Sequence, residues 1–78
     1  MGSAEDAYRR AVALAAELGM RPLVAHCHLG LGRLYRRADK RPSALDHLRA
    51  ATAMFREMEM PWWLDATEQE GKLLTPSP

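Results

Sequence analysis

Apolar residues recur every three or four positions along most of the chain, a spacing that places them on one face of an α-helix. Three prolines, Pro22, Pro42 and Pro61, interrupt the pattern, and each is followed by another amphipathic stretch. Proline is favoured at the start of a helix, because its missing N–H would have no partner there. The sequence therefore predicts four helices, over residues 3–18, 22–37, 42–59 and 61–73.

Each of the first three predicted helices has an apolar stripe that must be buried against a neighbour. The stripe positions are Ala4, Tyr8, Ala11, Ala15 and Leu18, then Val24, Cys27, Leu31, Leu34 and Tyr35, then Ala44, Leu48, Ala51, Phe55 and Met58. Short connections between such helices favour antiparallel neighbours. The pattern predicts an all-α fold built from antiparallel helical hairpins.

The chain also repeats itself. An ungapped alignment of the segment from Ser3 with the segment from Ser43 pairs several identical residues. The identical pairs are Ser3/Ser43, Ala4/Ala44, Asp6/Asp46, Arg9/Arg49, Ala11/Ala51, Ala13/Ala53, Glu17/Glu57 and Met20/Met60. A period of about 40 residues indicates a helical repeat array, here with two helices in each repeat.

One stretch alternates small and bulky residues at a characteristic spacing, with Leu31, Gly32 and Tyr35 followed by Ala44, Leu48 and Ala51. This spacing resembles the signature of the tetratricopeptide repeat. Gly32 and Ala44 let two helix backbones approach, and Tyr35 fills the space between them. The sequence departs from the signature at His28, which replaces a Trp, and at Pro61, which comes late.

The resemblance implies a four-helix fragment of a tetratricopeptide-like α-solenoid. We expect a single domain over residues 3–73 and a flexible tail over residues 74–78. The domain would hold about one and a half to two repeats of about 40 residues each. In this arrangement the first helix is the second half of a repeat, and the last helix is a cap with a polar outer face.

Residues 17–35 also resemble the C-terminal repeats of multidomain bacterial regulatory proteins, in which a nucleotide cyclase or other regulatory head precedes an ATPase and a tetratricopeptide array. The resemblance implies no activity for this segment, because the cyclase and ATPase motifs lie outside it. The phosphate-binding pattern Gly-x4-Gly-Lys-[Ser/Thr] is absent from the sequence. We expect neither catalysis nor a cofactor.

The formal net charge is only +1, which argues against nucleic acid as the partner. No apolar run has the length of a membrane span, and no leader pattern is seen at the N-terminus. Cys27 is the single cysteine, so an internal disulfide is impossible and a reducing compartment is favoured. We expect a cytoplasmic protein that does not bind membranes.

The only cluster with metal-ligand chemistry is His26-Cys27-His28, with His47 as the remaining histidine. On a helix, His26 and His28 point about 200° apart and cannot chelate one ion. Cys27 is expected in the core, and no third group is placed to orient a catalytic histidine. The cluster therefore predicts packing, not metal binding or catalysis.

The tetratricopeptide arrangement would place one face of the second and fourth helices along a groove. The residues expected on it are His26, Leu29, Arg33, Arg36, Arg37, Gln69 and Leu73. An apolar floor with a basic end suits an acidic peptide or a C-terminal carboxylate. The alternative for the arginines is a solvated face that complements the helix dipole. This groove favours a protein–protein interaction or scaffold module.

Self-assembly is the second function that the sequence supports, since about three repeats are normally needed for stability. The residues expected at a self-association surface are Tyr8, Ala11, Val12, Ala15, Leu18, Trp62 and Trp63. We expect a homodimer in which the same end of two copies meets about a two-fold axis. Packing within the cap is the alternative for the two tryptophans, which cannot both face the core.

Overall fold

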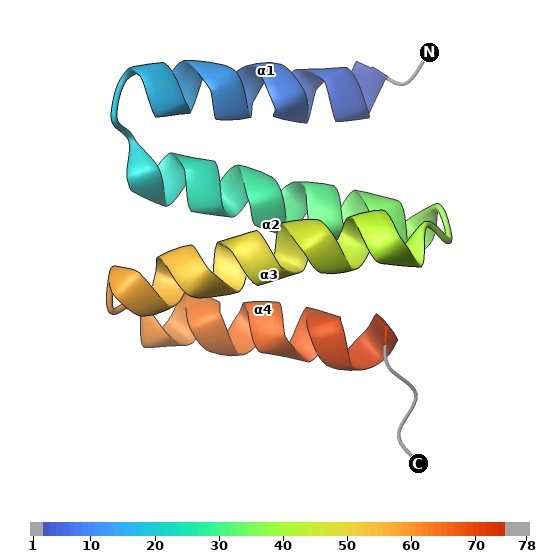
Figure 1. The fold of residues 1–78 in the computed structure, drawn as a ribbon. Coiled ribbons are helices and arrows are strands. Elements are labelled where there is room, and N and C mark those ends of the chain that lie inside the picture. The colour runs from blue at the N-terminus through green and yellow to red at the C-terminus, as the bar shows by residue number, and fades with distance from the viewer. Residues whose placement is uncertain (1–2, 75–78) are drawn as a thin grey trace.

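The computed structural model describes residues 3–74, and in this range the chain is entirely helical apart from its turns. The helices are α1 (Ser3–Glu17), α2 (Arg21–Arg37), α3 (Arg41–Glu57) and α4 (Pro61–Leu74). Consecutive helices run antiparallel and lie side by side in chain order (Figure 1). The predicted all-α fold of four helices in antiparallel hairpins is confirmed.

The helix boundaries differ from the predicted ones by one or two residues. α2 and α3 begin one residue before Pro22 and Pro42, so these prolines occupy the second helical position, where an N–H is still not needed. α4 extends to Leu74, which the sequence placed in the tail. The remaining tail prediction, residues 75–78, lies outside the described residues.

The three turns between helices have the same backbone geometry. In the first turn, Met20 N–H donates to the Ala15 carbonyl at 2.8 Å and Gly19 N–H donates to the Ala16 carbonyl at 3.2 Å. The same pair of bonds recurs in the turns that end at Lys40 and Met60. This pattern is a Schellman motif, which requires a left-handed residue after the helix. The helices therefore start at regular intervals, at residues 21, 41 and 61.

α2 and α3 form the centre of the molecule because their backbones approach closely at Gly32. A Cβ atom on Gly32 would lie 2.5 Å from Cδ2 of Leu48 and 3.5 Å from the carbonyl oxygen of Ala44. Tyr35 and Phe55 complete the same core and are almost fully buried. The six residues of the repeat signature are all buried between these helices.

The four helices are not covered equally by their neighbours. α2 contacts each of the other three helices and α3 contacts α2 and α4, whereas α1 contacts α2 alone among the described residues. Trp63 of α4 packs against the core, while Trp62 is 70% exposed. No helix in the described range is long and apolar enough to cross a membrane.

Two of the left-handed turn residues carry a side chain, and replacing them by glycine should stabilise the fold. Asp39 has φ 61° and Glu59 has φ 54°, where an L-residue is strained and glycine is not. Glu59→Gly should raise the free energy of unfolding by about 0.5–1 kcal/mol, with a smaller gain for Asp39→Gly, since Asp tolerates this region better. Urea denaturation measures the change.

Gly19, with φ 71° in the equivalent turn, supplies the control. Gly19→Ala should lower the urea midpoint, since alanine is strained in the conformation that glycine adopts freely. A decrease in stability for Glu59→Gly would contradict the assignment of a left-handed conformation to this turn.

A second prediction concerns the close approach of α2 and α3. Gly32→Leu should lower the stability by about 1–3 kcal/mol or more, because the larger side chain overlaps Leu48. Gly71→Ala is the matched control: a Cβ there would meet nothing within 4 Å, so this change should be neutral or stabilising. An unchanged thermal midpoint for Gly32→Leu would mean that the helices do not meet at this residue.

Candidate protein-binding surface

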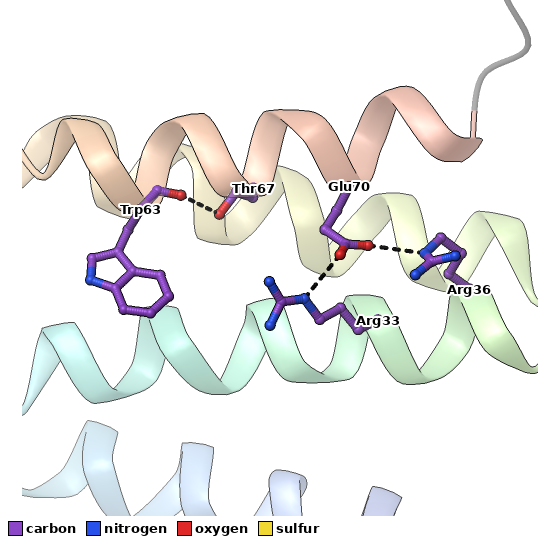
Figure 2. A network of polar contacts seen from close by, with 5 residues as sticks. All are labelled: Arg33, Arg36, Trp63, Thr67 and Glu70. Atoms are coloured by element: carbon purple, nitrogen blue, oxygen red, sulfur yellow. Dashed lines mark hydrogen bonds and ion pairs between the residues drawn. The ribbon is translucent and has the colours of Figure 1, made fainter.

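The arginines at the C-terminal half of α2 are held by a carboxylate from α4. Glu70 accepts from Nε of Arg33 at 3.0 Å and from Nε of Arg36 at 2.9 Å, and its side chain is only 15% exposed (Figure 2). Hydrogen bonds between charged groups are short and directional. Glu70 therefore fixes both side chains and offsets part of their positive charge.

The remaining space between α2 and α4 is filled by aromatic packing. Trp63 reaches from α4 toward α2, and its ring stands edge-on to that of His26 at 4.2 Å between centroids (Figure 2). His26 also meets Phe55 edge-on at 5.2 Å. Thr67 is buried, and its hydroxyl donates to the Trp63 carbonyl at 2.8 Å. The packing of Trp63 against His26 therefore occupies part of the space between α2 and α4.

The residues predicted to line the α2–α4 groove therefore have different environments. Leu29 is 2% exposed and belongs to the core, so it cannot form the floor of an open groove. Gln69 and Leu73 are exposed on α4, and Arg37 is exposed at the end of α2. Leu29 is thus removed from the predicted groove, whereas His26, Arg33 and Arg36 are half-buried.

An open pocket of about 310 Å³ lies instead on the other side of α2, against α1. The residues that line it are Ala4, Tyr8, Gly30, Arg33, Leu34 and Arg37. Gly30 is needed here, because a Cβ atom at this position would overlap the ring of Tyr8. The two helices approach at Gly30 and leave an apolar hollow beside two guanidinium groups.

The charge of this pocket is concentrated on Arg37. Arg33 shares the Glu70 carboxylate, whereas no carboxylate among residues 3–74 forms an ion pair with Arg37. An apolar hollow next to an unpaired guanidinium can hold a side chain of matching shape and a neighbouring carboxylate. The sequence analysis found both arginines but not this pocket, since it assigned Tyr8 to self-association and could not place α1 against Gly30.

A pair of histidines, His28 on α2 and His47 on α3, forms a second polar cluster. Their Nδ1 atoms lie 3.0 Å apart, so one neutral ring donates and the other accepts. The sequence analysis treated His28 as a replacement for Trp and as a neighbour of His26, and did not pair it with His47. His28 and His47 lie at comparable distances before and after the turn at Asp39, so antiparallel packing of their helices brings them together. This spacing is the signal that could have revealed the pair.

The histidine pair connects to α1 through Tyr35. The ring of His47 stacks on Tyr35 at 5.4 Å, and the Tyr35 hydroxyl accepts from Arg9 Nη2 at 2.8 Å. Burial lowers the pKa of His28, with a further contribution from His47. Burial and the charge of Arg9 also lower the pKa of His47. Both rings are therefore stabilised in the neutral form.

The histidines of the His26-Cys27-His28 cluster make packing contacts, His26 with Phe55 and Trp63, and His28 with His47. No group of three or more His, Cys, Asp or Glu side chains in the described residues could hold an ion. Cys27 is buried, and burial raises the pKa of its thiol, which disfavours the reactive thiolate. His26, Cys27 and His28 thus occupy packing positions.

The residues predicted for self-association lie on α1, in the turn after it and at the start of α4. Ala15 is buried, Ala11 and Val12 are half-buried, and Tyr8 and Leu18 are exposed. Leu18 is 63% exposed and Leu14, which was not predicted, is 57% exposed. The open part of α1 therefore includes the end nearest the first turn.

Helices stacked in chain order, with two helices in each repeat of the sequence, define a helical repeat module that offers surfaces and pockets to other molecules. The family model for the tetratricopeptide repeat matches residues 1–57, well over half of the chain. The chain belongs to the tetratricopeptide repeat family. Searches of curated proteins and of solved structures found no significant match.

The histidine pair should make stability fall on mild acidification. Because both pKa values are lowered from about 6.5, the unfolded chain binds more protons as the pH falls through this value, and folding becomes less favourable. The urea midpoint should therefore be lower at pH 5.5 than at pH 7.5. Glu5 titrates below this window, since hydrogen bonding to Tyr35 and the charge of Arg9 lower its pKa from 4.5.

The double variant His28→Gln/His47→Gln is the control for this effect. Glutamine can keep a hydrogen bond between α2 and α3 but has no charge to gain, so the midpoint should change much less between the two pH values. A pH dependence that persists unchanged in the double variant would place its origin elsewhere.

Proposed function

We propose that this chain is a non-catalytic protein-binding module that takes an acidic, partly apolar peptide segment into the pocket between α1 and α2. Tetratricopeptide repeats generally mediate protein–protein interactions. The observation that carries the proposal is the Arg37 guanidinium, which has no ion pair within residues 3–74, beside the apolar hollow at Tyr8 and Leu34. The apolar walls would receive a side chain, and Arg37 would pair with a carboxylate next to it.

The ion pairs on the other side of α2 support this arrangement. Glu70 holds Arg33, which lines the pocket, so a ligand does not have to order this side chain when it binds. Less conformational entropy is then lost on association. The small net charge of the chain means that recognition would depend on this local grouping and not on a long-range field.

The resemblance of residues 17–35 to bacterial regulatory proteins supports a finer proposal. In it, this repeat segment acts within a cytoplasmic regulatory protein and connects a signalling head to its partner. A single cysteine that is buried fits a reducing compartment. Nucleic acid remains the disfavoured partner class, because the formal net charge is only +1.

Arg37→Glu tests the proposed pocket without breaking any ion pair in the described structure. An array of peptides that place Asp or Glu beside Leu, Phe or Tyr should yield sequences that bind the parent chain and weaken with added salt. Arg37→Glu should lower their affinity about tenfold or more, because a carboxylate then faces a carboxylate.

Arg49→Glu is the matched control, since Arg49 is exposed on α3, outside the pocket lining. It makes the same change in net charge and should retain binding. Equal loss in both variants would indicate a nonspecific charge effect, and unchanged binding by Arg37→Glu would exclude this pocket.

Self-assembly remains the second candidate function. The observation that favours it is the exposure of Leu14 and Leu18 at the α1 end of the stack and of Trp62 on α4 at the other. Large apolar side chains that are exposed together commonly belong to an interface.

A further inference from the structure

The helices at the two ends of the molecule correspond, in the 40-residue frame, to the two helices of the central interface. α1 is the sequence copy of α3, since the alignment that pairs Ser3 with Ser43 runs along both helices. In the same frame, the start of α4 at Pro61 corresponds to the start of α2 at Arg21. α1 and α3 therefore occupy one position of the repeat, and α2 and α4 occupy the other. Inside the molecule, α3 follows α2 and packs against it.

The internal α2–α3 contact shows which positions such an interface uses. On α2, Arg21 pairs with Glu57 and His28 meets His47. Val24 lines one hollow together with Met54. These α2 positions, one helical turn or so apart, are the ones that α3 covers.

The corresponding positions on α4 border a hollow of about 580 Å³, where Pro61 is exposed and Leu64 is half-buried against the core. Its lining residues are Pro61, Trp62, Leu64, Asp65 and Glu68. In the frame of the repeat, Pro61, Leu64 and Glu68 correspond to Arg21, Val24 and His28. α4 thus leaves part of the corresponding surface open, in the half of the helix that begins at Pro61.

The matching surface on α1 is open as well. Leu14 and Leu18 are 57% and 63% exposed, whereas their counterparts on α3, Met54 and Met58, are half-buried against the core. Tyr8 is partly exposed, while its counterpart Leu48 is buried by α2. The positions of Leu14 and Leu18 are thus open, whereas Tyr8 already packs on Gly30 of its own α2.

The charges at the two ends are also complementary. Arg10 on α1 takes the place of Ala50, which is half-buried on α3. Asp65 and Glu68 line the hollow on α4, and Glu68 also pairs with Arg56 of α3. Neither Arg10 nor Asp65 forms an ion pair within the described residues. Opposite charges at the rim favour the correct register of association.

We propose that α1 of one copy of this chain docks on α4 of another copy, head to tail, through the positions that correspond to Met54 of α3 and Val24 of α2. Leu14 then meets Leu64 of the next copy, and Glu17 lies near Pro61. Because the two faces differ, the contact leaves one open end of each kind and continues from copy to copy. The two-fold dimer expected from the sequence pairs like ends, and this arrangement pairs unlike ends.

This inference does not rest on the proposed peptide site, because the residues varied below do not line that pocket. Docking would cover Tyr8, which belongs to both surfaces. The peptide assay is therefore done at concentrations where the chain is a single molecule, and the assembly assay measures mass alone. Failure of one leaves the other intact.

The experiment measures the mass of the full 78-residue chain by sedimentation over a wide range of concentrations. The parent chain should grow in mass with concentration beyond a dimer. Leu14→Glu blocks the α1 end and Trp62→Asp blocks the α4 end. Both sites are exposed, and an acid at the second residue of α4 favours its helix, so each variant should fold and sediment as a monomer.

Mixing the two blocked variants decides between the geometries. Each retains the face that the other has lost, so an equimolar mixture should form a one-to-one dimer and nothing larger. Ala53→Glu, an exposed change on α3, is the control and should assemble like the parent chain. A two-fold α1–α1 dimer would instead leave Trp62→Asp dimeric by itself. Either that result or a parent chain that stays monomeric overturns the proposal.

Discussion

The close approach of α2 and α3 at Gly32 is the contact on which the other helices depend. Without a side chain at this position, Leu48 enters the space beside the α2 backbone, and the two apolar stripes bury each other. Only then do α2 and α3 present a surface on which α1 and α4 can pack, since an amphipathic helix of this length has little stability alone. The outer helices therefore take their positions from the central pair.

Polar contacts at the edges of this pair fix the outer helices in different ways. On one side, Glu70 of α4 bridges Arg33 and Arg36, and aromatic packing by Trp63 fills the rest of the contact. On the other side, Arg9 of α1 donates to Tyr35 at the edge of the histidine pair. The first contact joins opposite charges, and the second depends on neutral rings, so mild acid acts chiefly on the second.

Unequal coverage of otherwise similar helices links the fold to both proposed activities. Within the part of the chain that the structure describes, α1 has one helical neighbour and α3 has two, although the two helices share a sequence pattern. The pocket beside Gly30 and the exposed Leu14 both lie on the helix that lacks the second neighbour. A peptide in the pocket and a second copy at the end are two ways to cover the same incompletely buried helix.

The sequence by itself determined the class of fold, because helical periodicity, prolines at helix starts and the alignment of the chain with itself are all properties of the linear order of residues. It also identified Gly32 and its neighbours as packing residues through their spacing. It could not place Leu29 in the core, pair His28 with His47, or show that Glu70 holds the arginines. Each of these depends on the rotation and spacing of helices far apart in sequence. The sequence also could not show which part of each apolar stripe stays exposed. That depends on how many neighbouring helices cover the stripe in the tertiary structure.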